Sequence, residues 1–376
     1  MVIKELSHRG RSGRGKKSGR PGKPPAARAP SGAARDVRTA RAGAVARVGA
    51  TARVRTTARV RTTARVGATA RVGATARVAS AMVTVRDLVR RGARRLNRAR
   101  VFYGHGTDNA LDESAALVFH ALNLSHAAGA AVYSKRVSAA AQQRIEALIT
   151  RRIDERIPAV YLTNETWFAG LAFHVDPRVL IPRSALAELI EKQFAPWIDA
   201  ARVKRVLDVG TGSGCIAIAC AVAFPRAHVD AVDISKDALK VAQTNVRKHR
   251  LGRRVRLVES DHFSALSNIS TATYDIIVSN PPYVGAREMR SLPPEYRHEP
   301  RIALAAGDSG LDSVRVILRE AGRYLRPGGL LVVEVGNTEA AVQRTFRDLP
   351  FVWLDFERGG GGVFLLTAEQ LHAHRL

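Results

Sequence analysis

The chain has 376 residues, of which 46% are hydrophobic, and its formal net charge is +27. This length suffices for two ordinary domains, and the hydrophobic fraction is that of a globular protein. The longest apolar run, residues 215–224, is much shorter than the roughly 20 residues of a membrane-spanning helix, so we expect a soluble, cytoplasmic protein with no membrane partner. Histidine and cysteine nowhere show metal-ligand spacing, so no metal is expected. Cys215 and Cys220 are expected to be buried, reduced thiols.

Residues 1–81 carry most of the charge, with 20 Lys/Arg against 2 Asp/Glu, which leaves a net of only +9 for the remainder. A six-residue unit rich in Ala, Arg, Val and Thr repeats from Ala46 to Ser80. This extension lacks the apolar bulk that offsets chain entropy, so it is predicted to be disordered. Three interpretations stay open: a cationic tail in weak contact with nucleic acid, a transit segment, or a translated repeat without an essential role. We favour the last, and Met82 is a candidate alternative start.

Residues 82–155 are predicted to form a small helical domain. Apolar residues recur at helical spacing between Leu88 and Leu124, and a further helix is expected from Ser138 to Ile153. Asp112 is expected to cap the helix that carries residues 115–122. A helical domain without a catalytic cluster favours recognition of a macromolecule. Residues 156–183 then alternate short apolar runs with Gly and Pro, which indicates a β-hairpin linker.

Strands and helices alternate from Val203 onward, as in the open parallel sheet of an α/β protein. The first strand ends in an acidic residue and a glycine-rich turn, and an apolar helix follows. Such a turn lets a ligand approach the backbone closely, and the helix beyond it presents free N–H groups. The candidate cofactor-binding residues here are Asp208, Gly210, Thr211, Gly212, Ser213 and Gly214.

Acidic residues also end the next two predicted strands. Asp233 follows the strand from His228 and is placed to accept the two ribose hydroxyls of an adenosyl ligand. After the strand from Val255, Asp261 is expected to accept from the adenine amino group, with His262 or Phe263 beside the ring. Three acids at three successive strand ends favour a cofactor site over three helix caps.

The fourth strand runs into Asn280-Pro281-Pro282-Tyr283. The prolines fix the backbone, so an NH₂ group could donate one hydrogen bond to the Asn280 side chain and another to the Pro281 carbonyl. These bonds would localise the nitrogen lone pair, and Tyr283 could lie against the planar group. Positioning and electrostatics would then supply the rate. We assign Asn280, Pro281 and Tyr283 as catalytic and all four residues as substrate-binding, with Asn280 also at the cofactor.

With this tetrapeptide the sequence resembles the amino- and amide-directed methyltransferases that use S-adenosylmethionine. Over residues 82–370 it resembles the protein-(glutamine-N5) methyltransferases of bacteria, at Arg156-Ile157-Pro158, Ile181-Pro182-Arg183, Glu299-Pro300, Gly310-Leu311-Asp312 and Pro327-Gly328-Gly329. The resemblance implies a seven-stranded Rossmann-like class I methyltransferase domain over residues 184–376.

Three stretches resemble the branch that acts on ribosomal protein uL3: residues 102–109, 296–300 and 356–360. The residues after Arg183 depart from the Pro-x-Thr-Glu of release-factor enzymes. The resemblance therefore implies S-adenosylmethionine as methyl donor and a glutamine of uL3 as acceptor. A release-factor enzyme and an amino-directed nucleic-acid methyltransferase stay open as alternatives.

Overall fold

The computed structural model describes residues 83–126, 128–266 and 274–374, which belong to one compact unit. The predicted disorder of residues 1–81, their predicted contact with nucleic acid and the candidate start at Met82 lie outside the described residues. Within the described ranges, no helix is long and apolar enough to cross a membrane.

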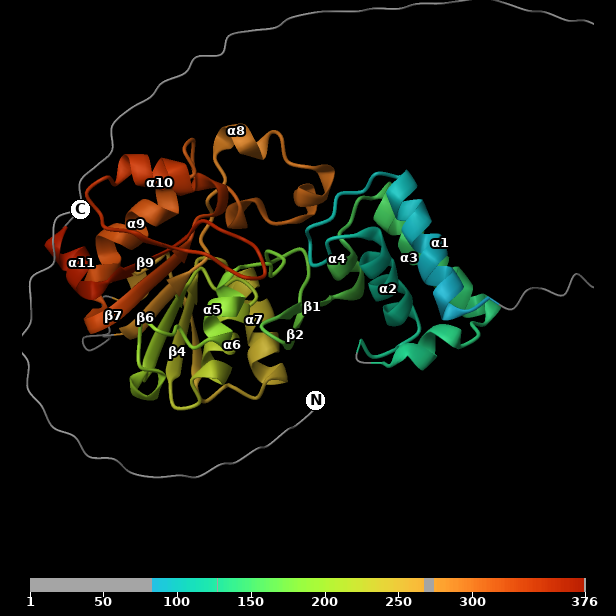
Figure 1. The fold of residues 1–376 in the computed structure, drawn as a ribbon, viewed down its shortest axis with the longest axis horizontal. Coiled ribbons are helices and arrows are strands. Elements are labelled where there is room, and N and C mark those ends of the chain that lie inside the picture. Colours follow the sequence, from blue (N-terminus) through green and yellow to red (C-terminus); the bar gives the residue numbers. More distant parts are fainter. Residues whose placement is uncertain (1–82, 127, 267–273, 375–376) are drawn as a thin grey trace, which may run out of the picture. The chain divides into compact units, whose positions relative to one another are not determined.

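Three helices pack around one apolar cluster at the beginning of the described chain (Figure 1). They are α1 (Val85–Arg98), α2 (Ala110–Ala121) and α3 (Ala139–Asp154), with a short 3₁₀ turn, η1 (Ala130–Ser134), before α3. Thr84 and Asp87 form a capping box at the start of α1, and the Ser138 hydroxyl caps α3. The buried residues include Leu88, Leu117 and Ile145, whose helical spacing predicted these helices.

The prediction that Asp112 caps α2 is wrong. Asn109 is the N-cap, and its side-chain oxygen accepts hydrogen bonds from the backbone N–H groups of Leu111 and Asp112, both at 3.0 Å. Asp112 lies in the first turn of the helix and accepts from the Asn109 amide at 2.8 Å. Both residue types are good caps, and the extended backbone of Asn109 decides which one serves.

A hairpin of β1 (Glu165–Phe168) and β2 (Leu171–His174) follows the helices. Its two-residue turn, Ala169-Gly170, has positive φ at both positions, as a tight hairpin turn with matching twist requires. The hairpin is shorter than the sequence suggested, because residues 159–163 form the short helix α4 (Ala159–Thr163). Pro158 stands directly before that helix, where a missing N–H does no harm.

The remaining chain forms a seven-stranded sheet in the order β5-β4-β3-β6-β7-β9-β8, of which β9 runs antiparallel to its neighbours. The strands are β3 (Arg205–Val209), β4 (His228–Asp233), β5 (Val255–Glu259), β6 (Tyr274–Ser279), β7 (Leu325–Glu334), β8 (Val352–Leu354) and β9 (Val363–Thr367). The predicted α/β class and the seven strands are confirmed.

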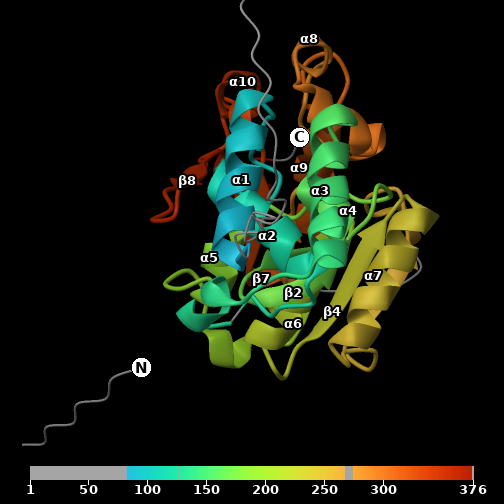
Figure 2. The ribbon, with the colours of Figure 1, turned by 90° about the vertical axis from the view of Figure 1, so that its right-hand side faces the viewer.

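Helices cover both faces of this sheet (Figures 1 and 2). One apolar cluster involves α5 (Leu186–Glu191), α6 (Cys215–Ala223) and α7 (Lys236–Lys248), and the other involves α9 (Asp312–Glu320), α10 (Glu339–Thr345) and α11 (Ala368–Ala373). Cys215 and Cys220 are buried and free, as expected. Chain order reverses between β3 and β6, so the loops after these strands diverge and leave a crevice at their carboxyl ends.

Candidate active site

The loop between β3 and α6 borders this crevice. Gly210, Gly212 and Gly214 all have positive φ, which explains the glycine pattern. A β-carbon at Gly210 or Gly212 would meet no atom within 4 Å, whereas one at Gly214 would lie 3.2 Å from the β-carbon of Ala242. The first two glycines therefore leave the backbone open to the crevice, and the third allows close packing on α7.

Asp208 lies beneath this loop and does not line the crevice. Its side chain is fully buried, and Oδ2 accepts from the Thr211 hydroxyl at 2.6 Å and from the Ala217 N–H at 3.1 Å. Its Oδ1 has no hydrogen-bond partner within the described residues. Burial raises the pKa of this carboxyl to about 7. In this structure Asp208 holds the loop and the start of α6 together.

Asp233 lies at the end of β4 and does line the crevice. Its Oδ2 accepts from the Gly212 N–H and its Oδ1 from the Ser235 N–H, both at 2.8 Å. Burial raises the pKa of this carboxyl. The two backbone bonds fix the carboxylate, and each oxygen keeps a lone pair for a ligand hydroxyl.

A cavity of about 250 Å³ occupies the crevice. It brings together most of the residues expected at the cofactor, which are Gly210, Thr211, Gly212, Ser213, Asp233, Asp261, His262 and Asn280. Phe263 is not among them, since its ring is buried and stacks on Tyr324 with centroids 5.1 Å apart. Gly214 also lies outside the lining.

The tetrapeptide follows β6 and forms the opposite wall of the cavity through Asn280, Pro281 and Pro282. The Ser279 hydroxyl donates to the Val209 carbonyl at 2.6 Å and so ties the end of β6 to the end of β3. The Asn280 Oδ1 is buried and has no hydrogen-bond partner within the described residues. An unpaired buried acceptor at a cavity wall is ready to bind a donor from a ligand.

Tyr283 lines a second, more polar cavity of about 580 Å³. Its ring lies over Gly336, where a β-carbon would be only 2.7 Å from Cε2. Glu334 lines the same cavity and accepts a hydrogen bond from the Ser184 hydroxyl. Burial raises the pKa of Glu334 to about 7.

Arg183 lines both cavities. The sequence did not identify it as a site residue. Its Nη2 donates to Glu299 Oε2 at 2.8 Å, and the guanidinium lies 5.3 Å from the centroid of the Tyr296 ring. Ile181 donates its N–H to Glu299 Oε1 at 3.1 Å. The sequence Ile181-Pro182-Arg183 is one of the segments that resemble the bacterial glutamine methyltransferases, but that resemblance did not indicate a role for Arg183.

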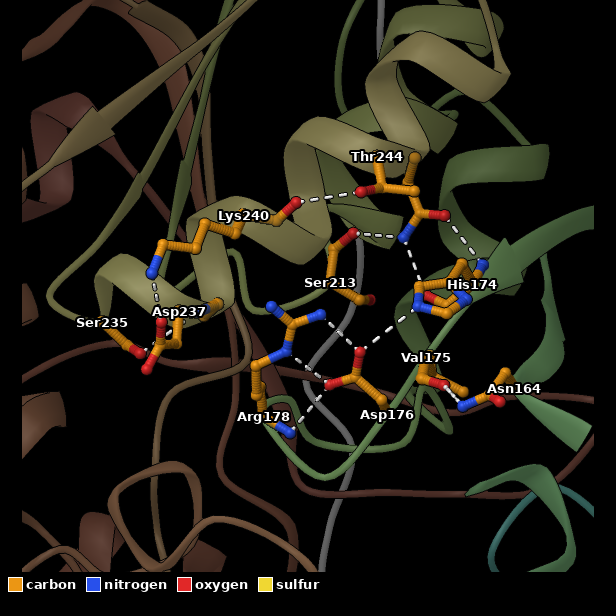
Figure 3. A network of polar contacts seen from close by, with 12 residues as sticks. Asn164, His174, Val175, Asp176, Arg178, Ser213, Ser235, Asp237, Lys240 and Thr244 are labelled. Carbon is orange, nitrogen blue, oxygen red and sulfur yellow. Dashed lines mark hydrogen bonds and ion pairs between the residues drawn. The ribbon is translucent and has the colours of Figure 1, made fainter. Parts of the chain in front are cut away.

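The hairpin is attached to the glycine-rich loop through α7 (Figure 3). Asn245 is buried, and its amide nitrogen donates to the carbonyls of Ser213 and His174, both at 2.9 Å. The His174 N–H returns a bond to the Asn245 Oδ1 at 2.7 Å. Figure 3 also shows the nearby pair of Asp176 and Arg178, and Arg178 lines the first cavity. This arrangement fixes one edge of the crevice. Within the described ranges, no group of three or more His, Cys, Asp or Glu could hold a metal ion.

Comparison with known proteins assigns the class. A family model described as "Methyltransferase small domain" matches residues 188–292, which span the glycine-rich loop and the tetrapeptide. The sheet, its crevice and this match define a methyltransferase. A solved structure titled "delta-N METTL16 MTase domain" is 18% identical, with a TM-score of 0.39 over 53% of this chain and 89% of that chain.

Curated relatives narrow the class to one family. A protein of Bordetella pertussis named "Ribosomal protein uL3 glutamine methyltransferase" is 49% identical over 290 residues, which cover 77% of this chain and 96% of the relative. A protein of the same name from Xanthomonas campestris is 47% identical and covers 79% of this chain and 95% of the relative. The chain belongs to the family of the ribosomal protein uL3 glutamine methyltransferases.

Proposed function

We propose that this enzyme transfers a methyl group from S-adenosylmethionine to the side-chain amide nitrogen of a glutamine in ribosomal protein uL3. The names of the relatives support the substrate. The observation that carries the chemistry is the buried Asn280 Oδ1, which lacks a partner in the described structure and lies at the wall of the first cavity.

The first cavity would hold the adenosyl part of the cofactor. Gly210 and Gly212 leave the backbone open, while the carboxylates of Asp233 and Asp261 line the wall and suit ribose hydroxyls and an amino group. His262 would flank the adenine, since Phe263 packs into the core. When bound, S-adenosylmethionine supplies a sulfonium-activated methyl group.

Asn280 and Pro281 would orient the acceptor nitrogen. The glutamine NH₂ group donates one hydrogen bond to Asn280 Oδ1 and the other to the Pro281 carbonyl. Both N–H groups are then held, and the lone pair points to the methyl carbon, to which the nitrogen forms its new bond as the carbon–sulfur bond breaks. The nitrogen afterwards releases one proton to water. Orientation of this kind supplies on the order of 7–11 kcal/mol of rate enhancement.

Tyr283 lines the second cavity together with Arg183. From there its ring would lie against the planar amide group of the glutamine. Helices α1 to α3 would recognise uL3, because residues 82–155 form a helical domain without a catalytic cluster. We place the reaction in the cytoplasm, where ribosomal proteins are made. A weak contact between the basic extension and nucleic acid stays a prediction.

Transfer of a labelled methyl group to purified proteins tests the proposal. Unmodified uL3, an unmodified release factor and ribosomal RNA are incubated separately with the enzyme and the labelled donor. Label on uL3, lost when its target glutamine is replaced by glutamate, is the expected result. Label only on the release factor or only on RNA would refute the substrate assignment.

A further inference from the structure

The segment that follows the tetrapeptide forms a closed excursion, which we name the acceptor loop (residues 284–305). It contains α8 (Ala286–Met289) and two 3₁₀ turns, η4 (Pro294–His298) and η5 (Arg301–Ala303). The Val284 N–H donates to the Leu304 carbonyl at 2.8 Å, and the Ala306 N–H donates to the Val284 carbonyl at 3.0 Å. The loop therefore returns to its starting point beside Tyr283. Its last turn supplies part of the wall of the first cavity, including Pro300 and Ile302.

The middle of the acceptor loop is anchored to the helical part of the chain through Glu295, whose side chain is buried. Its Oε1 accepts from the Phe102 N–H at 2.9 Å and from Arg152 Nη1 at 3.2 Å. Arg156 Nη1 lies 3.5 Å from the same oxygen. Phe102 precedes α2, Arg152 lies in the last turn of α3 and Arg156 follows that helix, so the contact joins segments about 140 to 190 residues apart in sequence.

Arg152 lies in α3, is fully buried, and contacts both the acceptor loop and α2. Besides Glu295 it binds Glu113 in α2, with Nε to Oε1 at 2.6 Å, and its Nη2 donates to the Phe102 carbonyl at 2.7 Å. A buried ion network is a weak source of net stability compared with an apolar core of the same volume. Its bonds have strict directions, however, and they hold the connected segments in one geometry.

We propose that Arg152 is a positioning residue for methyl transfer. Through Glu295 it fixes the acceptor loop against α3 and the segment at Phe102, and thereby sets the geometry of Asn280 and of the cavity wall. This inference rests on the proposed function. It implies that the helices expected to meet uL3 are connected to the acceptor site by a rigid contact.

Two matched truncations separate positioning from a structural role. Glu295→Ala and Glu113→Ala each remove one buried carboxylate from the same guanidinium, but only Glu295 belongs to the acceptor loop. For each variant the kcat and KM for uL3, the Kd for S-adenosylmethionine and the Tm are measured. We expect Glu295→Ala to lower kcat about 10- to 100-fold, because a displacement of about 1 Å at the reacting centre costs up to about 10²-fold. Glu113→Ala should lower the Tm comparably and leave kcat within about threefold.

A second arm does not depend on the substrate. Arg152→Lys keeps the charge, but a single ammonium group lacks the fork that reaches the three acceptors. Hydrogen exchange of the Val284 and Ala306 amides should accelerate at least tenfold in Arg152→Lys and Glu295→Ala, while that of β3 stays unchanged. Equal loss of kcat in the two truncations, or unchanged exchange of these amides, would overturn the inference. Failure of the wild-type enzyme to label uL3 would instead refute the proposed function and leave the exchange arm valid.

Discussion

Replacement of Asp208 by asparagine changes the pH dependence of stability in a direction that the structure fixes. The carboxyl is fully buried, and burial raises its pKa from 3.8 to about 7 in the folded chain. Between these two values the folded chain holds a proton that the unfolded chain has released. The contribution of Asp208 to stability therefore falls as pH rises from about 4 to about 7, and it stays at its lowest value above pH 7.

The magnitude follows from the pKa. Each pH unit between pH 5 and about pH 7 removes 1.36 kcal/mol, so the wild type loses about 2.7 kcal/mol over this interval through Asp208. An asparagine side chain at this position would keep the acceptor for Thr211 and Ala217, and its NH₂ group would occupy the place of the unpaired Oδ1. That buried NH₂ group costs roughly 1–3 kcal/mol at every pH. Its cost therefore cancels when the two pH values are compared.

Urea unfolding of the wild type and Asp208→Asn at pH 5 and pH 8 measures this difference. The variant should gain about 2–3 kcal/mol relative to the wild type on going from pH 5 to pH 8. Glu334→Gln is a matched control, because burial raises the pKa of this carboxyl to about 7 as well and it lies in the other cavity. An effect of Asp208→Asn that is the same at both pH values, while the control shifts, would refute the assignment of a protonated carboxyl beneath the loop.

Three further predictions concern the site and its surroundings. Asn280→Ala should lower kcat about 10²- to 10³-fold, with a smaller effect on the Kd for S-adenosylmethionine measured by calorimetry, because one preorganised acceptor is lost; an unchanged kcat would contradict the role of Oδ1. Gly310→Ala should reduce activity at least tenfold, because the new β-carbon would lie 2.4 Å from the Tyr283 carbonyl oxygen. Gly170→Ala is the control, since Gly170 has a similar positive φ but no atom lies within 4 Å of the added β-carbon; it should cost only about 1–2 kcal/mol of stability and retain activity. Burial lowers the pKa of His105 to about 4, so the wild type loses stability as pH falls below 6.5. His105→Leu should abolish roughly 3 kcal/mol of that loss between pH 7 and pH 4. Parallel curves of unfolding free energy against pH in the two proteins would contradict this prediction.

The alternation of strands and helices, and most of the residues that gather at the crevice, were predictable from local pattern. Asp208, Asp233 and Asp261 each lie within two residues of the end of an apolar run of strand length, and the glycine-rich turn follows the first of these runs. In a parallel sheet the carboxyl ends of neighbouring strands meet at one edge, so residues at these positions gather without further information. The tetrapeptide lies on the opposite wall because β6 is the neighbour of β3 on the side away from β4, an arrangement that local pattern does not specify.

Side-chain direction at these positions was not predictable from local pattern. His262 has φ +50, a left-handed conformation that breaks the alternation expected after a strand, and it lines the cavity while Phe263 enters the core. Tyr283 lies over Gly336 because that glycine, 53 residues later, has no β-carbon. Contacts between distant segments decide both outcomes, and such contacts leave no periodic signal.

The long-range ion network was also beyond prediction, since Arg152 stands on a helix where an exposed arginine is the ordinary expectation. Its two carboxylates come from α2 and from the acceptor loop, and neither spacing suggests a pair. A buried charge becomes recognisable only after the fold has brought its partners together.

Some of the unpaired buried polar atoms lie at or beneath the crevice where the proposed chemistry takes place. Seven buried side-chain atoms lack a hydrogen-bond partner in the described structure, and three of them belong to Asp208, Ser213 and Asn280. Each such atom costs roughly 1–3 kcal/mol, so chains tend to eliminate them unless a ligand completes the bonding. Asp208 lies under the loop and Ser213 within it, while Asn280 faces them across the cavity from the end of β6. Of these three residues Ser213 and Asn280 line the cavity, so each of two segments of its wall keeps an unpaired polar atom that a bound ligand can reach.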